Sequence, residues 1–196
     1  MSELSQTRSS LIQNLKNLDD TTSWQDFYDT YWMFINAVAV KMGANVDLAE
    51  EITQEAFVRV AKKIQDFHRD PLSGKFRNWL ATITKNIYID LTRKASLNTI
   101  KLLDFAEEKG SPIDDQFKHI WDLEWIQNHS RIAMNRTRKR VLFKHFQVFY
   151  LLAFQEYSAK ETSQLTGCNL PQVYVTRMRV AKVFKAEMEL LKRRES

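Results

Sequence analysis

The sequence predicts an all-α fold with two helical domains joined by a linker. Only four glycines and three prolines occur among the 196 residues, and they gather near positions 43, 71–74, 110–112 and 167–171. Between these places the apolar residues recur at steps of three and four, and no alternating segment long enough for a strand occurs. A hydrophobic content of 44% is sufficient to build a core in each domain.

Three predicted helices make up the first domain, residues 1–95. The first begins near Ser23, which we expect to be the N-cap, with Asp26 in the capping-box position. The second helix runs from about residue 47 to 66. The third covers residues 74–94, and its apolar stripe is formed by Phe76, Leu80, Ile83, Ile87 and Leu91.

The remaining side chains of this third helix combine cations with a tryptophan. They are Trp79, Lys85, Asn86, Arg93 and Lys94, with Lys75 and Arg77 at its entrance. A solvated face needs charge but rarely a tryptophan, whereas single-stranded nucleic acid is bound by cations on its phosphates and aromatic rings on its bases. This helix is therefore a candidate nucleic-acid site. Core packing is an equally good interpretation for Phe76 and Trp79, because both lie near the apolar stripe.

Residues 96–115 lose the helical pattern and are interpreted as an interdomain linker, after which residues 116–196 form the second domain. The segment SAKETSQLTGCNLPQVYVTRMRVAK has the spacing of a helix-turn-helix. Ser163 is small where two helices approach, Gly167 lies at the turn, and Val173 packs the second helix on the first. Asn169 can cap that second helix, and Pro171 in its first turn removes no hydrogen bond.

The second helix of this motif is expected to expose polar and basic side chains toward duplex DNA. They are Gln172, Tyr174, Val175, Arg177, Arg179 and Lys182. In the major groove, arginine pairs with guanine and glutamine with adenine, each good contact contributing roughly 1–3 kcal/mol. A helical hairpin with a basic face is the alternative that this segment leaves open.

The charge pattern separates these two basic segments from acidic ones. Residues 61–100 and 131–196 carry net charges of +5 and +9, whereas residues 1–60 and 101–130 carry −5 and −4. Two polyanion-binding surfaces are therefore expected, and the acidic segments should face something other than phosphate. The single cysteine, Cys168, allows no internal disulfide, and no signal peptide or membrane segment is evident, so we expect a cytoplasmic protein.

Three motifs in order resemble the extracytoplasmic-function sigma factors of bacterial RNA polymerase. DLAEEITQEAFVRVAKKI resembles region 2.2, FRNWLATITKNIYIDLTRK resembles regions 2.3 and 2.4, and the helix-turn-helix resembles region 4.2. The VYV step and the pair Trp121/Trp125 resemble a planctomycete-type subgroup. The usual Thr-Val-Lys-Ser-Arg pattern of the recognition helix is replaced here by Gln172-Val173-Tyr174-Val175-Thr176, which leaves the minus-thirty-five sequence unassigned. Thr162 also stands where isoleucine is usual.

The resemblance implies a role for each segment. Glu51, Gln54, Glu55 and Val58 would bind core polymerase, while Ile52 and Phe57 would belong to the core. The minus-ten element would be bound through the loop 68–75 and through Lys75, Phe76, Arg77, Trp79, Lys85, Asn86, Arg93 and Lys94. The implied partners are the clamp and flap regions of core RNA polymerase, promoter DNA and an anti-sigma factor. No cofactor, metal or membrane is implied.

Other classes of function account for less of the sequence. A helix-turn-helix regulator that binds duplex DNA as a dimer explains the second domain, but it leaves Trp79, Asn86 and the cationic end of the third helix unexplained. A module that captures polymerase without promoting initiation would bind no single-stranded minus-ten DNA. An enzyme is not expected, because no nucleophile has a nearby base and the four histidines lack metal-ligand spacing.

Overall fold

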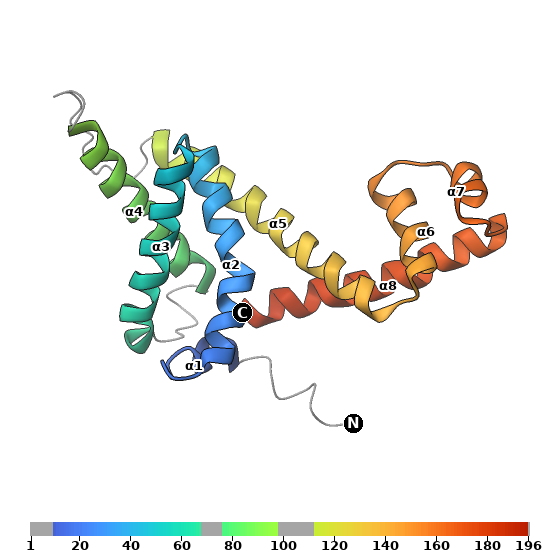
Figure 1. Ribbon diagram of the computed structural model, residues 1–196, viewed down its shortest axis with the longest axis horizontal. Helices are drawn as coiled ribbons and strands as arrows, with labels where there is room; N and C mark the ends of the chain where they lie inside the picture. Colours follow the sequence, from blue (N-terminus) through green and yellow to red (C-terminus); the bar gives the residue numbers. More distant parts are fainter. Residues whose placement is uncertain (1–9, 68–75, 98–111, 196) are drawn as a thin grey trace. The chain divides into compact units, whose positions relative to one another are not determined.

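The computed structural model describes residues 10–67, 76–97 and 112–195, which form helices without any strand (Figure 1). The elements are α1 (Ser10–Asn14), α2 (Thr21–Lys41), α3 (Val46–Lys63), the 3-10 helix η1 (Ile64–Asp66), α4 (Phe76–Leu97), α5 (Pro112–Arg140), α6 (Phe143–Phe154), α7 (Ala159–Thr166) and α8 (Leu170–Glu195). The predicted all-α class is confirmed. The chain divides into two compact units, of which the first comprises residues 1–128 and 194–196 and the second comprises His129–Arg193.

The first unit packs α2, α3, α4 and the first half of α5 around one apolar core. Aromatic rings fill much of its interior, with the centroids of Phe27 and Phe76 6.1 Å apart and those of Phe34 and Trp121 4.5 Å apart. Ile52 of α3 and Leu80 of α4 are fully buried beside them. The steps of three and four in the sequence therefore give each helix one buried face.

The N-terminus of α2 lies earlier than the sequence predicts. Asp20 is the N-cap, and its carboxylate accepts hydrogen bonds from the Ser23 backbone N–H at 3.0 Å and from the Ser23 hydroxyl at 2.7 Å. These bonds lower the pKa of Asp20, with the backbone bond as the larger cause. The predicted Ser23 cap with Asp26 in the capping box is wrong, because Ser23 already lies inside the helix and donates to the cap.

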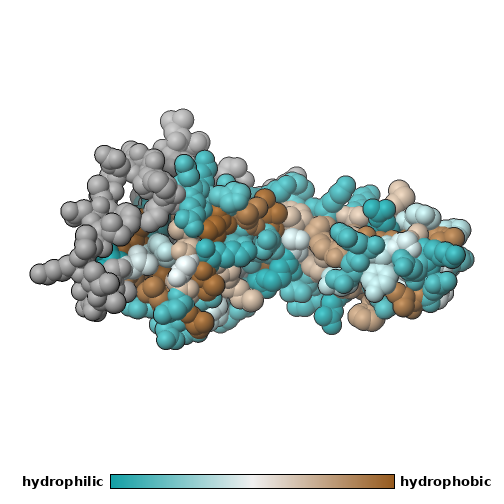
Figure 2. Space-filling model, turned by 90° about the horizontal axis from the view of Figure 1, so that it is seen from above, coloured by the Kyte–Doolittle hydropathy of each residue, from teal (hydrophilic) through white to brown (hydrophobic). Residues whose placement is uncertain are grey.

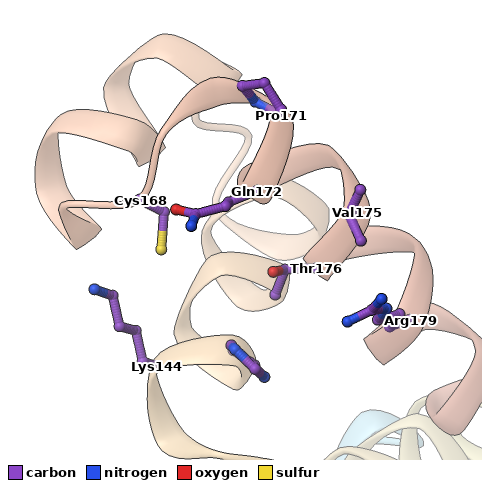
Figure 3. Close-up of a pocket in the computed structure, with 8 residues that line it drawn as sticks. Lys144, Cys168, Pro171, Gln172, Val175, Thr176 and Arg179 are labelled. Carbon is purple, nitrogen blue, oxygen red and sulfur yellow. The ribbon is translucent and has the colours of Figure 1, made fainter.

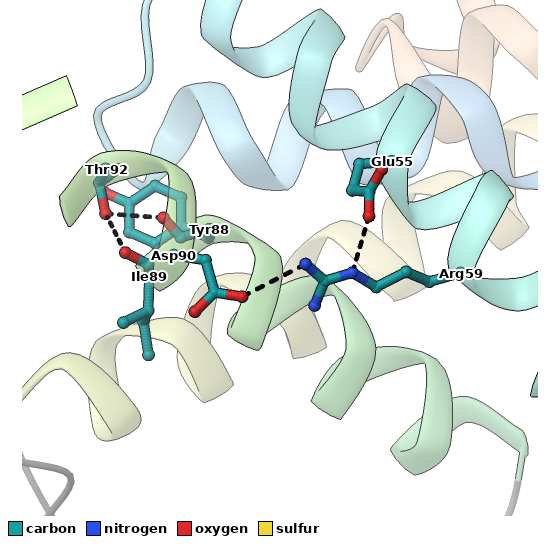
Figure 4. A network of polar contacts seen from close by, with 6 residues as sticks. All are labelled: Glu55, Arg59, Tyr88, Ile89, Asp90 and Thr92. Carbon is teal, nitrogen blue, oxygen red and sulfur yellow. Dashed lines mark hydrogen bonds and ion pairs between the residues drawn. The ribbon is translucent and has the colours of Figure 1, made fainter. Parts of the chain in front are cut away.

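Polar contacts join α3 to α4 and α2 to α4 in the first unit. Arg59 of α3 donates to Glu55 at 2.9 Å and to Asp90 of α4 at 3.3 Å, as Figure 4 shows. The hydrogen bond to Glu55 is the main cause that raises the pKa of Arg59. The Tyr88 hydroxyl donates to the backbone carbonyl of Met42 at 2.6 Å, and burial raises the pKa of Tyr88. These contacts fix the rotation of α4 and therefore which of its side chains face outward.

The second unit contains the helix-turn-helix on a small core. Val148 of α6, Cys168 of the turn and Val173 of α8 form its buried apolar cluster. Elsewhere in the unit Phe149 packs on Phe184, with ring centroids 5.7 Å apart. The carboxylate of Glu187 is buried and forms ion pairs with two arginines of α5, Arg140 and Arg136. A buried carboxylate needs such partners, because desolvation penalises an unpaired charge.

The first half of α5 belongs to the first unit, whereas the sequence places the start of the second domain near residue 116. Phe117, Trp121 and Trp125 of α5 are buried in the first core, with Trp121 and Trp125 stacked at a centroid distance of 5.9 Å. Asn128 donates to the backbone carbonyl of Thr30 at 2.9 Å. These side chains lie on one face of α5, and this face is buried in the first unit up to residue 128. Most of the predicted linker lies outside the described residues.

Polar side chains cover much of the surface in the view of Figure 2, with apolar residues between them. Among the described residues, no helix combines the length and the apolarity needed to span a membrane.

Candidate nucleic-acid interface

The outward face of α3 carries the predicted polymerase-binding residues. Glu51, Gln54 and Val58 are exposed, and their spacing of three and four places them on one face. Glu55 lies on the same face but is half-buried and accepts the hydrogen bond from Arg59. Ile52 is fully buried, as expected, and Phe57 is half-buried against the core. The face is thus acidic and polar with one apolar side chain, Val58, which is 43% exposed.

Phe76, predicted as a minus-ten base contact or a core residue, belongs to the core. Its side chain is 2% exposed. Its ring lies 5.7 Å from that of Phe67, 5.4 Å from that of Trp79 and 6.0 Å from that of Tyr31. A base could not stack on this ring without the core being opened, so Phe76 is removed from the candidate interface. The apolar stripe of α4 was the signal that predicted this outcome.

Two of the predicted phosphate contacts face the first half of α5. The ammonium of Lys85 forms an ion pair with Asp114 at 2.9 Å. Arg77 forms an ion pair with Asp122, and its guanidinium carbon lies 5.1 Å from the ring centroid of Trp125. Both cations are therefore already neutralised by carboxylates of this chain. The sequence reasoning missed this because the contacts join residues 29 and 45 positions apart.

The other predicted minus-ten residues share a different face of α4. Trp79, Asn86 and Arg93 follow one another at steps of seven and therefore lie along one side of the helix. Asn86, Arg93 and Lys94 are exposed. Trp79 is half-buried, with its ring 4.9 Å from that of Phe67, so part of the indole stays accessible. Lys75 and the loop 68–75 lie outside the described residues.

The helix-turn-helix has the geometry that its spacing predicts. Ser158 caps α7 in a reciprocal capping box with Glu161, and this hydrogen bonding lowers the pKa of Glu161. Gly167 ends α7 with a φ of 65°, a left-handed conformation that glycine adopts without strain. The Ser163 hydroxyl donates to the Cys168 carbonyl at 2.6 Å, and Val173 is fully buried. The predicted roles of Gly167 at the turn and of Val173 in the core are confirmed.

The N-terminus of α8 uses one residue that was predicted to contact bases. Asn169 accepts from the Gln172 backbone N–H at 2.9 Å, which confirms its capping role. The Gln172 side-chain oxygen in turn accepts from the Asn169 backbone N–H at 3.1 Å. Bidentate pairing of Gln172 with adenine needs that oxygen, so the cap would have to open first. The side-chain amide N–H groups of Gln172 are the donors that the cap leaves for DNA.

The exposed side of α8 carries the other predicted minus-thirty-five residues and one that the sequence reasoning missed. Tyr174, Val175, Arg177, Arg179 and Lys182 are all exposed. Met178 is 74% exposed and lies one turn from both Tyr174 and Val175. The helical spacing could have predicted that Met178 is exposed, because it places Met178 opposite the buried Val173, Thr176 and Val180.

A pocket of about 450 Å³ opens beside α8 and adds two basic side chains to this surface. Lys144 and His145 of α6 line it, together with Cys168, Pro171, Gln172, Val175, Thr176 and Arg179. Figure 3 shows Lys144 extending toward Cys168, with Gln172 and Arg179 on the α8 side. Sequence reasoning missed Lys144 and His145 because they precede the helix-turn-helix and reach it only through the packing of α6. The pocket can accept an anionic group beside the exposed face of α8.

Residues 27–97 match the sigma-70 region 2 family. The sigma factor SigW of Bacillus subtilis is 37% identical over 75 residues, covering 38% of each chain. SigE of Mycolicibacterium smegmatis is 31% identical over 72 residues, which are 37% of this chain and 26% of that protein. SigX of Bacillus subtilis is 24% identical over 170 residues, which are 87% of this chain and 86% of that one. All three are extracytoplasmic-function RNA polymerase sigma factors. The chain is thus similar to sigma-70 region 2 over residues 27–97, and to SigX over most of its length.

The match to the region 2 family covers most of α2 and all of α3 and α4, whereas the match to SigX extends over 87% of the chain. The chain spans less than two fifths of SigE and of SigW. A solved structure, CnrH in complex with the cytosolic domain of CnrY, covers 93% of this chain and 97% of that chain at 16% identity and a TM-score of 0.38. That likeness is too low to add to the assignment. The planctomycete-type subgroup stays a prediction.

Proposed function

We propose that this protein is a sigma factor, a transcription initiation factor that directs core RNA polymerase to particular promoters. The observation that carries the proposal is that each unit presents a face on which cations accompany apolar or aromatic side chains. On α4 this face contains Trp79, Asn86 and Arg93. On α8 it contains Val175, Arg179 and their neighbours. The acidic face of α3 is suited to a protein partner, because phosphate would repel it.

The α4 face is the proposed site for the unpaired minus-ten strand. Taking a base out of the stack costs a few kcal/mol, and stacking on an aromatic ring with hydrogen bonds to the base edge offsets that cost. The accessible part of Trp79 provides the ring, and Asn86 can donate to and accept from a base edge. Arg93 and Lys94 would bind phosphates. Arg77 and Lys85 are assigned to holding α5 rather than to DNA, because Asp122 and Asp114 already neutralise them.

The α8 face is the proposed site for duplex DNA of the minus-thirty-five element. Arg179 can form a bidentate contact to guanine, while Lys182 and Lys144 lie where they can bind phosphates on either side. The action is non-catalytic, because the sigma factor contributes binding energy and geometry but makes or breaks no bond. The clamp and flap regions of core polymerase are the proposed protein partners. An anti-sigma factor is a further proposed partner, and the cytoplasm the proposed location.

Open-complex formation tests this proposal. The purified chain is mixed with bacterial core polymerase on a library of promoter fragments that includes the DNA upstream of its own gene, and permanganate detects unpaired thymines. We expect melting that requires both proteins. Duplex binding without polymerase and no melting with it would instead support a dimeric helix-turn-helix regulator. Polymerase binding without any capture of single-stranded DNA would indicate a module that only sequesters polymerase.

A further inference from the structure

The exposed side of α8 has an apolar patch at its centre. The patch consists of Tyr174, Val175 and Met178, which are 54%, 45% and 74% exposed. These residues are one, three and four positions apart, so their side chains are neighbours on the helix surface. They lie opposite the buried Val173 and Val180 and take no part in the core of the unit. Packing within the described part of the chain therefore does not explain them.

Cations surround the patch. Arg177, Arg179 and Lys182 are exposed on the same helix, and Lys144 adds a fourth charge across the pocket. No aspartate or glutamate occurs between residues 169 and 186. A protein partner for this surface would need a protruding apolar side chain for the patch and carboxylates around it for the cations. Duplex DNA also offers negative charges around an apolar group. Its phosphates flank the major groove, and the apolar groups on the floor of that groove are the methyl groups of thymine.

We propose that Met178, Val175 and Tyr174 contact thymine methyl groups in the major groove, so that the minus-thirty-five element is recognised partly by thymine. The inference rests on the proposed function of α8 and adds the chemical class of base that its centre recognises. The C5-methyl of thymine is the apolar group that base pairs present in the major groove, which is wide enough to admit an α-helix. The unbranched side chain of Met178 is the most flexible of the three and can adapt to such a methyl.

The patch also accounts for a separate type of DNA contact at each part of α8. Gln172 is partly engaged in the N-terminal cap, so it cannot supply a full adenine contact. Arg179 remains for guanine, and Lys182 for phosphate. A thymine contact by Met178 then provides base discrimination more than two turns after the Asn169 cap, through an apolar contact rather than through charge or hydrogen bonding. Met178 is therefore assigned as a specificity-determining residue.

The test compares thymine with uracil, which differ only in this methyl group. A library of duplexes with a randomised central segment is enriched for binding to the full chain with core polymerase. The enriched duplexes are then prepared with thymine or with deoxyuridine, and both affinities are measured. We expect the uracil duplex to bind about fourfold more weakly for each contacted methyl group, the effect of burying one carbon of this size.

Variants of Met178 assign the effect to the patch. Met178→Gln keeps the length of the side chain but makes it polar, and should reduce the preference for thymine over uracil duplexes by about fourfold, the contribution of one methyl contact. Met178→Leu keeps an apolar side chain and should retain most of the preference. Leu165→Gln is the control, because Leu165 is exposed on α7 but does not belong to the patch. It should leave the ratio of the two affinities unchanged.

Three results would overturn the inference. Equal affinity of the parent protein for thymine and uracil duplexes would exclude methyl recognition while leaving duplex recognition intact. A ratio that survives Met178→Gln unchanged would show that Met178 contacts no methyl group and would remove its assignment as a specificity-determining residue. Failure to enrich any duplex would overturn both this inference and the proposed minus-thirty-five role of α8. If Met178→Gln weakens polymerase binding and the parent protein has no thymine preference, the patch is a protein-binding surface instead.

Discussion

A single hydroxyl group weakens the core of the second unit. Thr162 is fully buried, and its hydroxyl has no hydrogen-bond partner among the residues that the structure describes. An unsatisfied buried hydroxyl costs roughly 1–3 kcal/mol. Thr162→Val replaces that hydroxyl by a methyl group of similar size, so we expect the free energy of unfolding of the second unit to rise by about 1 kcal/mol in urea denaturation.

Thr166 provides the matched control for this substitution. It lies one turn away in the same helix, but its hydroxyl donates to the Thr162 carbonyl at 2.6 Å. Thr166→Val removes a satisfied group from a half-buried position, so it should leave the stability unchanged or lower it. A loss of stability in Thr162→Val would contradict the interpretation and imply that the hydroxyl is satisfied in solution.

The capping box of α7 predicts that the stability of the second unit depends on pH. Hydrogen bonds from Ser158 hold the pKa of Glu161 below its ordinary value of 4.5. Because the folded pKa is the lower one, Glu161 stabilises the unit fully above about pH 4.5, and this contribution is lost as the pH falls through the folded pKa. Glu161→Gln can still accept from Ser158 but cannot titrate. Urea unfolding across the acid range should therefore show a shallower loss of stability, and an unchanged slope would contradict the role of Glu161.

At the scale of elements, α3 has two faces with separate roles. Ile52 is buried in the core, whereas its neighbour Glu51 is exposed on the proposed polymerase-binding face. Glu51→Lys should therefore weaken core-polymerase binding at least tenfold while leaving the helical circular dichroism and thermal midpoint unchanged. Lys62→Glu, a charge reversal near the C-terminal end of the same helix, is the control. Unchanged affinity of the Glu51 variant would remove the polymerase assignment from this face.

The first half of α5 should be a structural part of the first unit rather than a loose linker. Trp121 is 3% exposed and packs on Phe34, whereas Leu123 on the same helix is 46% exposed. Trp121→Ala should lower the free energy of unfolding by about 3–5 kcal/mol. Leu123→Ala should change it by less than about 0.5 kcal/mol. Equal small effects of the two substitutions in urea denaturation would show that this part of α5 is not docked in solution.

The helices and their buried faces could be predicted because local periodicity determines both. The turn of the second unit could be predicted as well, since Gly167 and Asn169 act within a few residues of each other. The roles of Arg77 and Lys85 could not, because their partners come from α5 and no local pattern encodes that packing. The pocket beside α8 was missed for the same reason, since Lys144 reaches it from another helix.

At the scale of the whole molecule, the two units differ in the apolar cores that the structure describes. The first core includes Phe27, Phe34, Trp121 and many aliphatic side chains, whereas the buried cluster around the helix-turn-helix consists of Val148, Cys168 and Val173. Buried apolar area is the main source of stability, so the second unit should unfold first. A single two-state transition is therefore not expected for the free protein.

The tryptophans allow the two transitions to be separated. All five occur at positions 24, 32, 79, 121 and 125, within the first unit. Tryptophan fluorescence should therefore follow the first unit alone, while circular dichroism follows the helices of both. On heating, we expect an early loss of helix without a change in fluorescence, and then a second loss that coincides with it. Thr162→Val should raise only the early midpoint. Coincident transitions by both probes would mean that the two units unfold together. The small core of the second unit would then not determine the temperature at which that unit unfolds.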